Sequence, residues 1–261
     1  KLYPGYFYTM EPQYDEPLPR YPEISPARFE KLFLKLFVDE RQLHHRIYID
    51  ASSSMDWGKP NKSHLALKLA SALGYLSVQS MDRVSYYSIN GDCCKGLCRT
   101  VVGREAFYNA ADLLNGVKFY GESDLGKSLK SIEDPGGNNG LSVIISDFMT
   151  ESDFMGAVDY LLYHGREVFL VRILSRDEIT PSLSGKVFML DSESLDEEDP
   201  KNYKYEINRS AVKAYEEAFL YHQEQIQSFC DSRGVGFITL CSDESIEKIL
   251  FMRAVEGGLI Q

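Results

Sequence analysis

The feature that most constrains the fold is an alternation of short apolar runs with segments whose apolar residues recur at helical spacing. The runs are short, rich in Ile, Val and Leu, and bounded by turn residues, which is typical of buried strands. The predicted strands are 46–50, 84–89, 141–147, 167–174 and 235–240, and the predicted helices are 62–81, 106–114, 125–132, 154–163, 210–233 and 245–253. Strands that alternate with helices need crossover connections. The sequence therefore predicts an α/β fold, an open, mainly parallel sheet sandwiched by helices in a Rossmann-type three-layer arrangement.

Two hairpins are expected to interrupt this alternation. Asn90-Gly91-Asp92 is a strong turn signal, and we expect a returning strand near 97–102. A second hairpin is predicted as an insertion near 186–207. Residues 1–26, rich in Pro and Tyr, have no period and predict an irregular N-terminal arm, so that 27–261 form one domain.

Composition excludes several function classes. The formal net charge of -11 leaves no basic face for a nucleic acid and disfavours anionic membranes, although it is also explained by solubility alone. Five cysteines without framework spacing predict reduced thiols in a cytoplasmic protein. No apolar run approaches the length of a membrane span. The first residues lack both a signal-peptide pattern and an initiator methionine, so a removed upstream anchor stays an open alternative.

Oxygen-bearing side chains follow the central strands, where an open α/β sheet binds its ligands. Asp50 and Asp147 each end a predicted strand. In a locally extended turn, Ser52 and Ser54 would point to the same side as Asp50. Ser123, in a loop before a predicted helix, could add a third hydroxyl. A set made only of oxygens favours Mg²⁺ over zinc, with Mn²⁺ or Ca²⁺ as alternatives.

Three separated stretches resemble the metal-ion-dependent adhesion site (MIDAS) of von Willebrand factor A (vWA) and integrin I domains. The stretch Asp50-Ala51-Ser52-Ser53-Ser54 resembles their Asp-x-Ser-x-Ser motif. The stretch 121–126 resembles the loop that holds their fourth ligand, and 144–147 resembles the strand that ends in their fifth. The family normally has Thr where this chain has Ser123, which keeps the hydroxyl. The resemblance implies a vWA-like fold for the domain.

The chain resembles one bacterial branch more closely, the family called domain of unknown function 58. The resemblance is carried by 33–37, by Asp82-Arg83-Val84 and by Ser146-Asp147-Phe148, and it spans roughly residues 26–255. It implies that the three serines are direct or near-direct metal ligands, and that the two aspartates act mainly through waters or hydrogen bonds. Members are often encoded beside MoxR-type AAA+ ATPases, which implies a partner of that type.

These patterns predict a metal-dependent protein-binding module and not an enzyme. A cation held chiefly by neutral hydroxyls would attract an acidic side chain of a partner, with Trp57, Asp56 and Asp124 forming a rim around it. Trp57 is equally well explained by packing. Two alternatives remain open: a Mg²⁺-dependent hydrolase or phosphatase, and a structural domain whose serines and acids only cap turns around an empty site. A phosphatase of the haloacid dehalogenase type would need a second Asp where this chain has Ser52.

Overall fold

The computed structural model describes residues 42–132, 140–150, 152–181, 185–190, 202–207 and 209–253. Residues 41–261 belong to one compact unit. The predicted arm at 1–26 and the family-like stretch at 33–37 lie outside the described residues.

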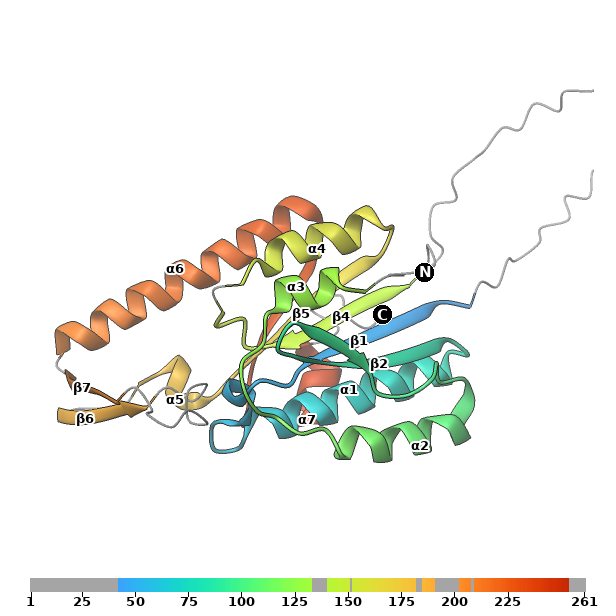
Figure 1. Ribbon diagram of the computed structural model, residues 1–261, viewed down its shortest axis with the longest axis horizontal. Helices are drawn as coiled ribbons and strands as arrows, with labels where there is room; N and C mark the ends of the chain where they lie inside the picture. Colours follow the sequence, from blue (N-terminus) through green and yellow to red (C-terminus); the bar gives the residue numbers. More distant parts are fainter. Residues whose placement is uncertain are drawn as a thin grey trace, which may run out of the picture. The chain divides into compact units, whose positions relative to one another are not determined.

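A six-stranded sheet in the order β3-β2-β1-β4-β5-β8 forms the middle of the unit (Figure 1). Its strands are β1 His44–Asp50, β2 Arg83–Asn90, β3 Cys93–Gly96, β4 Leu141–Ser146, β5 Glu167–Leu174 and β8 Gly236–Cys241. All neighbouring strands pair parallel except β2 and β3. The central strands are buried along most of their length, as continuous apolar runs require when helices cover both faces. The predicted open, mainly parallel α/β sheet is therefore confirmed.

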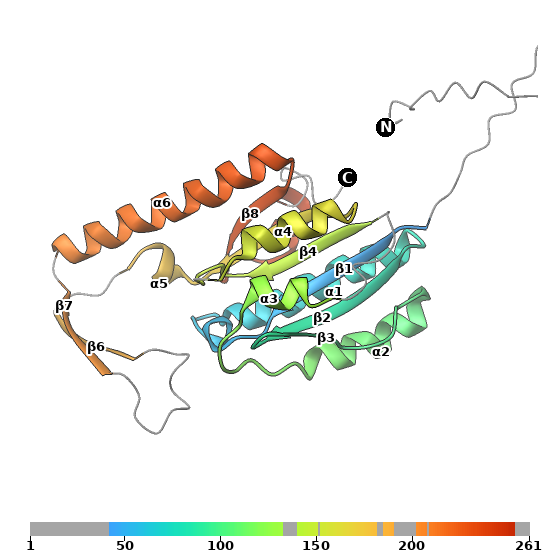
Figure 2. The ribbon, with the colours of Figure 1, turned by 45° about the horizontal axis from the view of Figure 1, so that its top comes forward.

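Helices cover the sheet on both faces, and each face has its own apolar cluster (Figure 2). On one face lie α1 Lys62–Gln79, α2 Gly103–Asn115 and α7 Ile246–Lys248, and on the other lie α3 Leu125–Lys130, α4 Phe154–Tyr163 and α6 Arg209–Arg233. The alternation of β1 illustrates the division, because Ile47 and Ile49 face the first group while Tyr48 faces the second. None of the helices in the described part of the chain is long and apolar enough to cross a membrane.

The first hairpin differs from its prediction. The returning strand β3 occupies 93–96, not 97–102, and Val101 makes only an isolated bridge with Val84. Asn90 pairs directly with Cys93, so the two-residue turn starts the ladder at once. The hydrophobic residues that suggested a later strand instead cover the cluster beside α1.

The second hairpin pairs β6 Gly185–Leu190 with β7 Asn202–Ile207 in a separate antiparallel sheet. Two elements were not foreseen. A short helix, α5 Arg176–Ile179, follows β5, and the predicted last helix at 245–253 is split into α7 and a π-helical turn at Ile249–Arg253.

The strand order places a crevice at the carboxyl end of β1. From β1 the chain crosses through α1 to β2 on one side, and β4 later pairs with the other side of β1. The loops that leave β1 and β4 therefore diverge, which is the point where open α/β sheets bind ligands. Asp50 and Asp147 stand at this point.

Candidate metal centre

Asp50 is the hub of the candidate centre. Its carboxylate is nearly fully buried at the end of β1. Oδ1 accepts hydrogen bonds from Ser123 Oγ at 2.8 Å and from the backbone N–H of Ser52 at 3.1 Å. Oδ2 accepts one from Ser146 Oγ at 2.6 Å. One carboxylate thus joins the three stretches of chain that were predicted from the sequence, although Ser146 itself was not among the predicted site residues.

Ser52 and Ser54 supply two further oxygens with a spacing that suits a small divalent cation. Their Oγ atoms lie 3.0 Å apart. In an octahedron with metal–oxygen distances of about 2.1 Å, adjacent ligands lie about 3.0 Å apart. The short helix at Ser53–Asp56 follows directly and fixes the backbone between them. The serine pair therefore fits two neighbouring positions around Mg²⁺.

Backbone hydrogen bonds hold the Ser52 turn against the Ser123 loop. Ser53 N–H donates to the carbonyl of Gly121 at 2.8 Å, and Tyr120 N–H donates to the carbonyl of Ala51 at 3.0 Å. Gly121 has a φ of 63°, a left-handed conformation that disfavours residues with a Cβ. These backbone contacts hold the loop of Ser123 beside the turn that follows Asp50.

Asp147 stands beside this cluster but is bound differently. Its Oδ2 accepts a hydrogen bond from Lys62 Nζ at 2.8 Å, and its Oδ1 accepts one from Met149 N–H at 3.0 Å. No hydrogen bond joins it to Asp50 or to the three serines among the described residues. Asp147 is nevertheless close enough for its charge to act on Asp50. The second predicted carboxylate is therefore present at the centre and already compensated by a lysine.

Lys62 begins α1 and is completely buried. It pairs with Asp147 and, at 2.7 Å, with Glu178 of α5. Burial alone would lower the pKa of Lys62, but the two carboxylates outweigh it and hold that pKa above its ordinary value. Glu178 also accepts a hydrogen bond from the N–H of Ser175 at 2.6 Å, which completes a capping box. The centre is thus tied to the start of α5.

The electrostatics of Asp50 favour a cation. Burial raises the pKa of Asp50, and the nearby charge of Asp147 raises it further, against three hydrogen bonds that lower it. All three of those donors are neutral, so the carboxylate has no cationic partner among the described residues. A divalent ion would supply that partner and favour the ionised form.

The turn after β4 carries a strained residue. Phe148 has a φ of 53°, which is uncommon for a residue other than glycine. Its N–H donates to Ser146 Oγ at 3.0 Å, and its ring is fully buried. The strained turn directs Asp147 toward Lys62 and Ser146 toward Asp50.

A buried arginine lies one strand further along the sheet. Arg172 of β5 pairs in register with Ser146 and is fully buried. Its guanidinium lies 4.7 Å from the centre of the Phe219 ring, a contact that contributes about 0.5–2 kcal/mol. The effective cost of burying a charge is several kcal/mol, so the ring alone does not compensate it.

The three predicted rim residues differ in their surroundings. Trp57 is 58% exposed and so does not belong to the core. Asp56 is exposed and accepts a hydrogen bond from Asn61 Nδ2 at 2.6 Å. Asp124 caps α3 by accepting from Lys127 N–H at 2.8 Å. Their role as a partner-binding rim stays a prediction.

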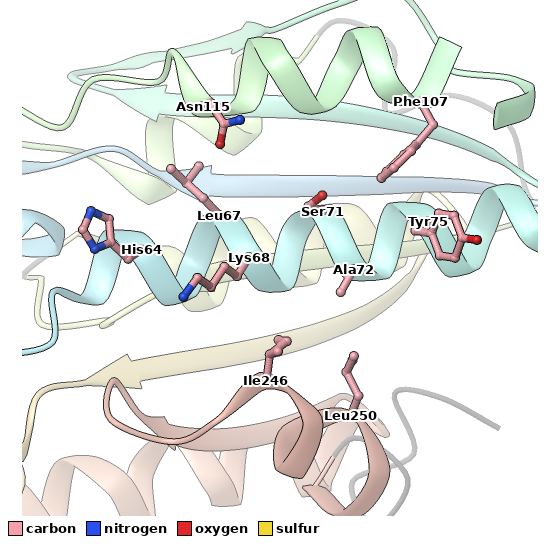
Figure 3. A pocket seen from close by; sticks show the side chains of 10 residues that line it. All are labelled: His64, Leu67, Lys68, Ser71, Ala72, Tyr75, Phe107, Asn115, Ile246 and Leu250. Carbon is pink, nitrogen blue, oxygen red and sulfur yellow. The ribbon is translucent and has the colours of Figure 1, made fainter. Parts of the chain in front are cut away.

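A hollow along α1 shares no lining residue with this centre. Figure 3 shows it between α1, α2 and the C-terminal turns, with His64 and Lys68 of α1 at its edge. Its lining is mainly apolar and includes no Asp or Glu. It offers no carboxylate ligand for a metal.

Sequence reasoning missed the residues that act through long-range pairing. Lys62 stands on the same helical stripe as Leu65 and Leu69, and this position signals an inward-facing lysine. Ser146 precedes a predicted ligand on a buried strand, where a hydroxyl needs a partner. Nothing in the sequence around Glu178 indicates that it reaches α1.

No group of three or more His, Cys, Asp or Glu side chains with a metal-binding arrangement occurs within the described ranges. The candidate centre contains only two such residues, Asp50 and Asp147, and its remaining oxygens belong to serines. Any metal there would depend on hydroxyl ligands.

Sheet order and helix layers define an α/β protein of the vWA-like class. The chain belongs to the family described as protein of unknown function DUF58, whose model matches residues 24–225. No curated protein matches the sequence.

Several solved structures are similar in fold. The conserved hypothetical protein BatB from Bacteroides thetaiotaomicron is 12% identical with a TM-score of 0.48, covering 84% of this chain and 100% of its own. The VWA domain of SpRpn10 is 9% identical with a TM-score of 0.44, covering 79% and 92%. Proximal thread matrix protein 1 from the mussel byssus, with a zinc-occupied MIDAS motif, is 11% identical with a TM-score of 0.38, covering 51% and 36%.

Proposed function

We propose that this chain is a metal-dependent protein-binding module. A divalent cation, Mg²⁺ first with Mn²⁺ or Ca²⁺ as alternatives, would be held by Ser52, Ser54 and Ser123 together with Asp50. Asp147 would act from beside the site. The observation that carries this proposal is the meeting of two distant loops at the buried Asp50 carboxylate: Ser123 Oγ and the N–H of Ser52 both donate to it, and the Ser52 turn holds Ser52 Oγ and Ser54 Oγ 3.0 Å apart.

The donor set supports an interaction role for the cation. Three of the four donors are neutral hydroxyls, and Asp147 is compensated by Lys62. A cation held in this way would keep much of its positive charge and would bind an outside carboxylate. The partner we propose therefore presents an Asp or Glu side chain.

The residues around the site favour a partner protein as the source of that carboxylate. Trp57 follows the Ser52 turn and is well exposed, and Trp is enriched among residues that contribute most to protein interfaces. We propose that Trp57 packs against the partner next to the metal. A MoxR-type AAA+ ATPase is the partner that the family resemblance implies, with this chain as its adaptor.

The proposal is tested first by metal binding alone. We expect Mg²⁺ to raise the unfolding temperature of the wild-type chain in a saturable manner, because a ligand of the folded state stabilises it. Asp50→Ala and Ser52→Ala should lose this response. Ser53→Ala, in the same turn but outside the proposed ligand set, is the matched control and should keep it. Equal responses of wild type and Asp50→Ala would contradict the proposal.

The partner is tested by affinity capture. The full chain, immobilised in Mg²⁺ or in chelator, is offered a purified MoxR-type ATPase from the same organism. We expect capture by the wild type in Mg²⁺ only, and no capture by Ser52→Ala. Metal binding without capture would refute the ATPase as the partner but would not contradict the proposed metal site. Phosphate release from p-nitrophenyl phosphate under the same conditions would favour the hydrolase alternative.

A further inference from the structure

We propose that the chain has a second binding site, independent of the metal, in which Arg172 binds a carboxylate beneath α6. This site lies beside the candidate metal centre but uses other residues, and it does not rest on the metal-dependent function.

A row of polar residues crosses the sheet near its carboxyl edge. Ser146, Arg172 and Thr239 are register partners on β4, β5 and β8. Paired residues on neighbouring parallel strands point to the same face of the sheet. Ser146 Oγ already donates a hydrogen bond to Asp50. The row therefore continues from the metal centre to Arg172 and Thr239. The long helix α6 (Figure 1) carries Phe219, whose ring lies against the guanidinium of Arg172.

Five buried polar atoms at this place have no hydrogen-bond partner in the described part of the chain. All three guanidinium nitrogens of Arg172 are buried and without an acceptor. The same is true of Thr239 Oγ1 on the neighbouring strand and of Nδ1 of His222 on α6. His222 lies close enough to Arg172 for the charge of the guanidinium to lower its pKa, in addition to the lowering by burial. Native proteins rarely leave such groups unpaired, and a cluster of them indicates a missing ligand.

The nearest groups of the protein do not satisfy Arg172. Asp147 and Glu178 are near enough to act on it through their charges, but both are hydrogen-bonded to Lys62. The ring of Phe219 contacts the guanidinium through its π face and accepts none of its N–H donors conventionally. A buried guanidinium needs an acceptor that this arrangement does not supply.

A carboxylate fits this need better than a more highly charged anion. The planar fork of arginine matches the two oxygens of a carboxylate. The charges already present are balanced, because Lys62 and Arg172 oppose Asp147 and Glu178. One added negative charge is therefore easier to bury here than the two of a phosphate dianion. Thr239 and His222 would supply further donors to the same group.

The part of α6 that covers this site is only partly buried. Phe219 and His222 are both only partly buried, and Tyr215, one turn before Phe219, is 38% exposed. This half of α6 thus shields Arg172 without being part of the tightly packed core, which begins at Ile226.

The test uses acetate as the probe, with the full chain in chelator so that the metal site plays no part. We expect sodium acetate to raise the unfolding temperature of the wild type above that in sodium chloride of equal ionic strength. The Nε–H resonance of Arg172 should shift saturably over the same titration. Sodium phosphate at equal ionic strength should not shift this resonance, although as an excluded salt it raises the unfolding temperature without binding.

Two arginine variants complete the test. Arg172→Met removes an unpaired buried charge, so it should raise the unfolding temperature without acetate and abolish the response to acetate. Arg176→Met is the matched control, because Arg176 is exposed and pairs with Asp243 at the surface, and it should keep the response. The proposal would be overturned by a wild-type Nε–H resonance that does not shift with acetate, by a saturable shift of that resonance with phosphate, or by an acetate response of the same size in Arg172→Met.

Discussion

Replacing Lys62 by methionine tests the electrostatics of the candidate centre directly. Methionine keeps the length and the apolar stem of the side chain and removes only the ammonium. Lys62 Nζ lies 2.8 Å from Asp147 Oδ2 and 2.7 Å from Glu178 Oε1. The variant therefore leaves two carboxylates without their cation. Asp147, at 4% exposed, has almost no water to replace it, whereas Glu178 is 22% exposed and partly solvated.

The expected loss follows mainly from Asp147. Breaking a buried pair by removing one partner costs about 3–5 kcal/mol, because the remaining charge stays buried. For a domain of this size, 1 kcal/mol corresponds to about 2–4 °C in the unfolding temperature. We expect Lys62→Met to unfold about 6–20 °C below the wild type in chelator at neutral pH. The raised pKa of Lys62 keeps the pairs charged there, and their contribution is lost only as the pH rises above 10.5.

Thermal unfolding followed by circular dichroism measures this effect, with two comparisons. Lys68→Met changes an exposed lysine of the same helix and should leave the unfolding temperature nearly unchanged. Lys62→Met combined with Asp147→Asn removes both charges and should recover much of the loss. A loss below about 1 kcal/mol in the single variant, typical of exposed pairs, would refute the reasoning that Asp147 is a buried and compensated charge.

Three smaller predictions concern the loops and the base of β1. Ser123→Ala should weaken Mg²⁺ binding in a calorimetric titration, whereas Ser123→Thr keeps the hydroxyl and should bind at least as well as the wild type; equal weakening by both would contradict a ligand role. Gly121→Ala should cost about 1–2 kcal/mol in urea unfolding, since a Cβ meets no atom within 4 Å at this position and only the φ of 63° is unfavourable; an unchanged midpoint would contradict this. Burial, with nearby arginines, lowers the pKa of His44 from 6.5 to about 4, so its contribution to stability is present above pH 6.5 and is lost as the pH falls toward 4. His44→Gln should flatten the decline in stability over that range, and an identical pH profile would contradict the assignment.

The sequence predicted the fold well where local signals were strong. The segments 154–163 and 167–174 have the predicted bounds in the structure, because each is an apolar run closed by turn residues. The first hairpin was misplaced, since Cys93 to Gly96 are mostly exposed and lack the apolar alternation that marks a strand. Their strand conformation comes from pairing with β2, and not from their own side chains.

The candidate centre was predictable where its members share a motif and not where they pair over long distances. The Asp50 turn was found as a local pattern, and Ser123 was found through its place in a second one. Lys62 is separated from Asp147 by 85 residues and from Glu178 by 116. A lysine is almost never fully buried unless paired, and periodicity along one helix does not show its partners. For the same reason the burial of Arg172 could not be predicted, because its environment is formed by three strands and α6.

The two carboxylates of the centre are stabilised in different ways, and the difference leads to a last prediction. Asp50 receives only neutral donors, whereas Asp147 is compensated by Lys62. A bound divalent cation would therefore be offset by about one carboxylate charge and would keep about one positive charge for an incoming acid. In Lys62→Met, Asp147 becomes available to the cation, so Mg²⁺ should bind more tightly while the affinity of the metal-loaded chain for an acidic partner falls. Calorimetry with Mg²⁺ and capture of the partner at saturating Mg²⁺ measure the two effects separately. A variant that bound both ligands more tightly, or both more weakly, would contradict this division of charge.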